Sequence, residues 1–121
     1  MVTDSYRDFV LERLGAVVDD VRHRRMFGGV GIYAGASFFA LIDDDVLYFK
    51  VGDANRGDFE GAGMRPFAPF GDAARPMQYW EVPGEVLEDD ERLRQWAAAA
   101  ITVAREAAAA RSRKTKPKGK S

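Results

Sequence analysis

The sequence predicts an α+β fold: an antiparallel sheet of about five strands with flanking helices, in the order α-β-β-β-α-β-β-α. One observation behind this prediction is a series of strand-like segments between residues 21 and 51, joined by short turns that are typical of an antiparallel meander. The other is a stripe of apolar residues at helical spacing near the C-terminus, which predicts a long amphipathic helix.

The first half of the chain predicts one helix followed by three strands. Thr3 or Asp4 can cap a helix of about three turns, and Gly15 is a suitable end for it. In the first strand, Gly28 and Gly29 indicate a bulge or the close approach of another backbone. The three predicted strands cover residues 21–33, 37–42 and 46–51.

The second half predicts a short helix, two further strands and a long helix. Asp53 can cap the short helix, which extends to Ala62 and contains glycines that weaken it by about 1 kcal/mol each. Asp89 or Asp90 can cap the long helix. The two strands cover residues 65–67 and 77–82. The apolar stripe of the long helix consists of Leu93, Trp96, Ala97, Ala100, Ile101, Ala104 and Ala108.

Charge divides the chain into a predicted domain of residues 1–110 and a predicted disordered basic tail of residues 111–121. Subtracting the six cations of the tail from the chain's 18 Lys and Arg residues leaves 12 against 19 acids, a net charge of −7 for residues 1–110. An acidic domain is a poor general surface for phosphates, so weak, non-specific nucleic-acid contact is predicted for the tail. A solubilising role for the tail is the alternative. The tail cations are Arg111, Arg113, Lys114, Lys116, Lys118 and Lys120.

No arrangement of reactive side chains predicts an enzyme, a metal site or a cofactor. The chain has no cysteine and one histidine, His23, which excludes Cys–His nucleophiles and histidine-rich metal sites. The glycines after Phe27 lack the spacing of a dinucleotide loop and the Gly-Lys-Ser/Thr of a phosphate loop. Residues 43–45, all aspartates, predict a hairpin turn because they lack the ligand order of a calcium loop.

A cytoplasmic protein without membrane attachment is expected. The N-terminus has neither the basic nor the apolar region of a signal peptide, and the apolar runs are too short to span a bilayer.

A local basic cluster consists of Arg22, Arg24 and Arg25, close to Phe27 and Tyr33. Cations interleaved with aromatic rings can bind single-stranded nucleic acid by phosphate contact and stacking. Arginines on a strand of an acidic domain can equally pair with neighbouring carboxylates, and this is the favoured interpretation.

The segment Arg25-Met26-Phe27-Gly28-Gly29, followed by Gly31-Ile32-Tyr33, resembles the opening signature of the TfoX/Sxy N-terminal domain family. Further blocks match in the family's order, among them residues 39–42, 47–51 and 77–83, so that the resemblance covers about residues 4–110. It implies an α+β domain and brings no catalytic residue or cofactor. Family members include bacterial regulators of natural competence, thought to act with a cyclic-AMP receptor-type activator at promoters. The larger regulators have a C-terminal domain, and this chain resembles a single-domain member.

The leading hypothesis is a non-enzymatic regulatory or adaptor domain that acts through protein contacts, with weak DNA contact by the tail. Its partner would be an activator or another part of the transcription machinery. A homodimer through a sheet edge or the alanine-rich side of the last helix is a further hypothesis. The alternative function is a small-molecule binding module with an aromatic-lined pocket. The candidate lining residues are Phe27, Tyr33, Tyr48, Tyr79 and Trp80.

Overall fold

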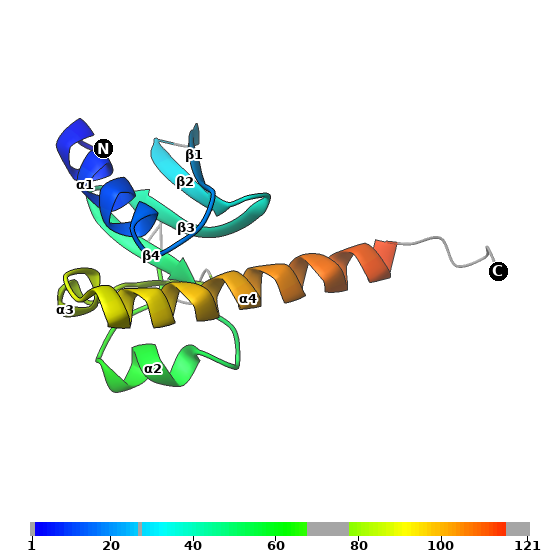
Figure 1. Cartoon of the computed structure of the whole chain (residues 1–121). Coiled ribbons are helices and arrows are strands. Elements are labelled where there is room, and N and C mark those ends of the chain that lie inside the picture. The colour runs from blue at the N-terminus through cyan, green and yellow to red at the C-terminus, as the bar shows by residue number, and fades with distance from the viewer. Residues whose placement is uncertain (1, 27, 68–77, 116–121) are drawn as a thin grey trace.

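The computed structural model describes residues 2–26, 28–67 and 78–115 and confirms the α+β fold (Figure 1). A single five-stranded antiparallel sheet has the order β1-β2-β3-β4-β5, so each strand pairs with the next one along the chain. The strands are β1 (Val21–Met26), β2 (Gly29–Ala34), β3 (Ser37–Asp43), β4 (Val46–Lys50) and β5 (Tyr79–Glu81). The helices are α1 (Asp4–Gly15), α2 (Arg56–Gly61), α3 (Gly84–Leu87) and α4 (Asp90–Thr115).

The strands are distributed differently from the prediction, because the single long strand predicted for residues 21–33 is a hairpin of β1 and β2. Gly28 has a φ of 79°, a left-handed conformation that reverses the chain where a bulge was expected. Met26 and Gly29 therefore face each other across the hairpin. The strand predicted at residues 65–67 is reduced to an isolated bridge between Pro66 and Trp80. Four strands thus precede α2, and one follows it.

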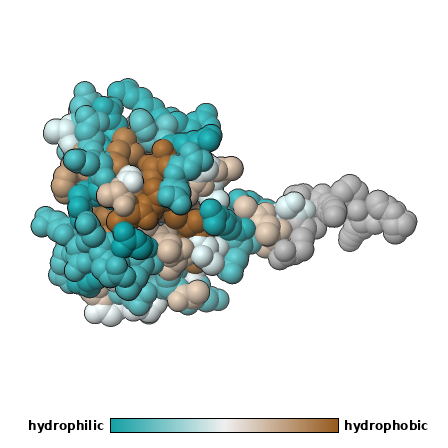
Figure 2. Space-filling model, viewed as in Figure 1, coloured by the Kyte–Doolittle hydropathy of each residue, from teal (hydrophilic) through white to brown (hydrophobic). Residues whose placement is uncertain are grey.

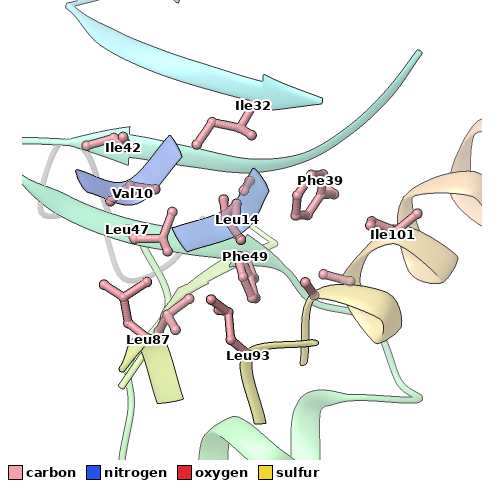
Figure 3. Close-up of a cluster of buried hydrophobic side chains, with 14 of the residues drawn as sticks. Val10, Leu14, Ile32, Phe39, Ile42, Leu47, Phe49, Leu87, Leu93 and Ile101 are labelled. Atoms are coloured by element: carbon pink, nitrogen blue, oxygen red, sulfur yellow. The ribbon is translucent and has the colours of Figure 1, made fainter. Parts of the chain in front are cut away.

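The hydrophobic core lies between one face of the sheet and the helices α1, α3 and α4 (Figure 3). Side chains such as Leu14 of α1, Phe49 of β4 and Leu93 of α4 are fully buried there. Each large side chain of this kind stabilises the fold by about 1.5–3 kcal/mol relative to the exposed state. The predicted stripe of α4 is confirmed from Leu93 to Ala104, whereas Ala108 is exposed.

Contacts between aromatic rings hold the short helix α2 against α4 and β5. Phe59 is buried, and its ring centroid lies 4.7 Å from that of Trp96 on α4 and 6.3 Å from that of Trp80 on β5. The helix begins at Arg56, and the predicted cap Asp53 instead pairs with the Arg56 guanidinium at 2.8 Å. That prediction is wrong because the loop before α2 is organised by the buried amide of Asn55, which accepts a hydrogen bond from the Gly52 N–H at 2.8 Å.

The predicted caps of the two long helices are confirmed. Thr3 accepts a hydrogen bond from the Tyr6 N–H at 3.3 Å at the start of α1. Asp89 accepts from the N–H groups of Glu91 and Arg92 at 3.0 and 3.1 Å at the start of α4. Helix α4 continues through Thr115, into the segment that the sequence predicts to be disordered, and it extends beyond the sheet (Figure 1). Residues 116–121 lie outside the described part of the chain.

The aspartate-rich turn between β3 and β4 has a structural role that the sequence did not reveal. Asp44 and Asp45 both have positive φ, 52° and 59°, as the central residues of a tight hairpin turn do. The Asp45 carboxylate accepts hydrogen bonds from the N–H and the hydroxyl of Thr3, at 2.8 and 2.9 Å. The turn therefore ties the capped start of α1 to the end of the sheet.

Candidate functional site

The two edges of the sheet differ. The outer side of β5 is covered by residues 65–67: the Phe67 N–H donates to the Tyr79 carbonyl at 2.7 Å, and the Glu81 N–H donates to the Arg65 carbonyl at 3.1 Å. Along the outer side of β1, no described residue forms a backbone hydrogen bond. Within the described part of the chain, the sheet therefore has one covered edge and one uncovered edge, which we call the β1 edge.

The turn of the hairpin decides which backbone groups of β1 point outward. A two-residue turn makes Met26 and Gly29 a hydrogen-bonded pair, and such pairs alternate along the ladder. The Gly35 N–H donates to the Asp20 carbonyl at 2.9 Å, which fits the same alternation. His23 and Arg25 consequently direct their N–H and C=O groups away from β2.

The side chains of the β1 edge are basic and exposed. Arg22 pairs with Asp20 at 3.0 Å, as the sequence predicted for this cluster. Arg24 and Arg25 form no ion pair with any described residue, so for them the prediction of pairing is wrong. The physical reason is that the domain's acids lie on other elements, whereas β1 pairs with a strand that carries none.

A cavity of about 780 Å³ lies beside this edge, between the start of α1 and the β1–β2 hairpin. Arg7 and Arg25 lie at its sides together with Asp4, and its apolar lining includes Met26 and Val30. Figure 2 shows further hydrophobic side chains at the surface between α1, the hairpin and α4. The β1 edge is therefore bordered by both charged and apolar surface.

The signature residues of the sequence lie in the β1–β2 hairpin and have a packing role there. A side chain at Gly29 would collide with the Ile42 carbonyl oxygen of β3. A Cβ at Gly31 would lie 2.6 Å from the terminal methyl of Met26, which crosses this glycine. Tyr33 stacks on Phe38 with a centroid distance of 5.1 Å. Phe27, also in the signature, lies outside the described residues.

A second surface lies where α4 leaves the sheet, in a cleft of about 380 Å³ that we call the α4 cleft. One wall comes from the β2–β3 turn, the end of β4 and the start of β5, and the other from the C-terminal half of α4. The lining residues are Ala36, Ser37, Phe38, Lys50, Tyr79, Ala104, Arg105, Ala107, Ala108 and Arg111.

Electrostatics in the α4 cleft are governed by burial and by neighbouring cations. Burial lowers the pKa of Lys50, and the nearby charge of Arg111 lowers it further. The Lys50 ammonium lies 5.2 Å from the centroid of the Tyr79 ring, within cation–π range. Burial raises the pKa of Tyr79 to about 12, so its hydroxyl is a neutral hydrogen-bond donor at physiological pH.

The predicted pocket residues are only partly brought together. Tyr79 lines the α4 cleft, and Tyr33 is linked to it through the ring of Phe38, which lies 5.5 Å from Tyr79. Tyr48 packs on Phe67 instead, at 4.7 Å. Trp80 packs against α2 and so takes no part in this group.

Of the predicted nucleic-acid residues, Arg111 lies on α4 and lines the cleft. Arg113 and Lys114 continue the same helix. Lys116, Lys118 and Lys120 lie outside the described residues.

Metal-binding clusters and membrane-spanning helices are both absent from the described part of the chain. No group of three or more His, Asp or Glu side chains there is arranged to hold a metal ion. None of the helices that the structure describes combines the length and the hydrophobicity needed to cross a membrane.

A five-stranded antiparallel meander with helices packed on one face and one uncovered edge defines a small α+β domain. The family model of the TfoX N-terminal domain matches residues 12–104, and the chain therefore belongs to this family of regulatory-type domains. No curated protein matches the chain.

Proposed function

We propose that this chain is a non-catalytic regulatory or adaptor domain that binds an acidic, extended segment of a partner protein along the β1 edge. The observation that carries the proposal is the uncovered edge with two exposed arginines, Arg24 and Arg25, that have no ion pair among the described residues. Membership of the TfoX N-terminal domain family supports a regulatory role. A transcription activator of the kind that the family's competence regulators act with is the sort of partner expected.

Backbone groups provide the affinity in this mode of binding. An extended peptide laid beside β1 would bond to the outward N–H and C=O groups of His23 and Arg25, and so add a sixth strand. Charged side chains on exposed edge strands usually prevent unwanted pairing with other chains, and the arginines of β1 have this effect. A partner strand must therefore offset the positive charge of these arginines, which only an acidic segment can do.

Register determines where the partner's acids are needed. Arg24 lies on the same face as Gly31, its partner on β2, and Arg25 lies on the opposite face with Val30. Acids at neighbouring positions of the partner strand would meet one arginine on each face. A second copy of this chain would instead place arginines against arginines, so self-pairing through this edge is disfavoured.

The test is a binding experiment with the full chain and edge variants. The variants Arg24→Glu with Arg25→Glu reverse the charge, and His23→Pro removes an outward N–H without breaking the pairing with β2. The control is Arg94→Glu, which reverses one arginine charge on α4, away from the edge, where Arg94 pairs with Glu91 at 3.0 Å. The probe is a fluorescent peptide in which pairs of adjacent glutamates alternate with pairs of valines, so that glutamates lie on both faces of the strand.

The wild-type chain and Arg94→Glu should bind this peptide, and both edge variants should bind at least about tenfold more weakly. Hydrogen exchange should show protection of the His23 and Arg25 amides on binding. If the edge variants bind as tightly as the wild type, or if protection falls elsewhere, the β1 edge is not the contact surface.

A further inference from the structure

The α4 cleft joins parts of the chain that are far apart in the sequence. Lys50 ends β4, Arg105 and Arg111 belong to the last turns of α4, and Phe38 lies just after the β2–β3 turn. All four line one cleft because α4 packs across β3 and β4 and then extends past the sheet (Figure 1). The cleft is distinct from the β1 edge, since none of its lining residues belongs to β1.

The charge of the α4 cleft is opposite to that of the domain around it. Its lining contains three cations, Lys50, Arg105 and Arg111, and no carboxylate among the described residues. Residues 1–110 carry 12 cations against 19 acids, and Lys50 is their only lysine. Burial lowers the pKa of Lys50, and the like charge of Arg111 on the facing wall lowers it further. An anion bound in the cleft would be attracted by cations on both of its walls.

Polar and apolar groups are arranged at different parts of the cleft. Tyr79 and Arg111 both line the cleft, so it offers a hydroxyl donor as well as a guanidinium. Phe38 is partly exposed and, together with three alanines of α4, gives the cleft an apolar surface. A ligand that fits has an anionic end and a flat apolar part.

We infer that the α4 cleft binds a nucleotide unit, with its phosphate on Lys50, Arg105 and Arg111 and its base against Phe38. Ammonium and guanidinium groups are the side chains that bind phosphate oxygens, and arginine can do so with two hydrogen bonds. Aromatic rings accept bases of any sequence by stacking. The volume of about 380 Å³ is in the range of small-ligand sites. A free nucleotide and a single-stranded nucleic acid share this chemistry.

The test uses the full-length chain and fluorescence anisotropy with two probes, a fluorescently labelled AMP and a labelled single-stranded oligodeoxythymidine. The cleft variants are Lys50→Gln and Arg105→Gln, singly and together. Arg105 is exposed, so its replacement leaves the fold intact, and circular dichroism checks each protein. The first control is Arg94→Gln, which removes the same charge from α4 outside the cleft. The second replaces Lys116, Lys118 and Lys120 by Gln, which removes tail charge only.

Each cleft substitution should weaken binding about tenfold and the pair about 100-fold, while Arg94→Gln leaves it within about twofold. Inorganic pyrophosphate should compete. Binding of AMP identifies a free nucleotide as the ligand, and binding of the oligonucleotide alone identifies a strand. The inference is overturned if neither probe binds the wild-type chain, if the double cleft variant binds as tightly as Arg94→Gln, or if only the tail replacement abolishes binding. The last result would assign nucleic-acid contact to the tail.

Discussion

Replacing Gly29 by alanine should strongly destabilise the domain. Gly29 begins β2, it is buried, and the Cβ of an alanine would overlap the carbonyl oxygen of Ile42 on the neighbouring strand β3. A side chain could move aside, but this oxygen belongs to the backbone of a central strand and is fixed by its ladder. The new methyl group must therefore push β2 and β3 apart at the place where the hairpin joins the sheet.

The magnitude follows from the nature of this obstacle. Overpacking costs about 1–3 kcal/mol, and the upper end, about 3 kcal/mol, applies because the clash is with backbone. This is a large part of the total stability of about 5–15 kcal/mol that a domain has. At about 3–4 °C per kcal/mol for a chain of this length, the Tm of Gly29→Ala should fall by roughly 10 °C.

Two other glycine-to-alanine substitutions calibrate the result. At Gly31 the new Cβ would meet the end of the Met26 side chain at 2.6 Å, and this flexible group can shift, so a smaller fall of a few degrees is expected. At Gly57, an exposed position within α2, nothing lies within 4 Å of the new Cβ. There alanine should raise the Tm, because it is the better helix former by about 1 kcal/mol.

Differential scanning calorimetry of the wild type and the three variants measures these shifts. The expected order of Tm is Gly57→Ala, wild type, Gly31→Ala and Gly29→Ala, from highest to lowest. A Tm for Gly29→Ala within about 1 °C of the wild type would refute the argument. It would mean that β2 and β3 are not packed together as closely as the structure has them.

Two further predictions concern α2 and the α4 cleft. Phe59→Ala should lower the free energy of unfolding by about 3–5 kcal/mol. It should also shift the fluorescence emission of Trp80 and Trp96, the chain's two tryptophans, because both rings contact Phe59. Unchanged emission would contradict this packing. Burial raises the pKa of Tyr79 from 10.0 to about 12, so its stabilising effect is complete below pH 10 and is lost as the pH rises toward 12. In urea unfolding across this pH range, the free energy of unfolding should fall by at most about 2–3 kcal/mol because of this residue. The variant Tyr79→Phe should show a smaller fall. An identical pH profile for the variant and the wild type would count against the raised pKa.

The parts of the fold that the sequence predicted correctly depend on local signals. Thr3 and Asp89 cap their helices through contacts with residues two or three positions away, which a sequence pattern contains directly. The spacing of the α4 stripe likewise follows from helix geometry alone. The hairpin at Gly28 was missed because a bulge and a turn use the same residue type and differ in backbone angles, which composition does not encode.

The candidate surfaces were less predictable because they depend on strand order and on tertiary contacts. Whether β1 is an edge follows only from the pairing of the whole sheet. Arg24 and Arg25 were recognised as a cluster, but their lack of carboxylate partners needed the positions of the acids. Arg111 was predicted to contact nucleic acid as part of a flexible tail, whereas the structure places it beside Lys50 in the α4 cleft. No spacing in the sequence relates these two residues.

The covering of the β5 side by residues 65–67 has a consequence for the size of any assembly. When both edges of a sheet are uncovered, chains can be added without limit, because each added chain presents another uncovered edge to the next, as in fibrils. Here the described sheet can grow only next to β1, so each copy of the domain can pair directly with one partner strand. Complexes built in this way should have a fixed one-to-one stoichiometry, and raising the protein concentration should not lengthen them.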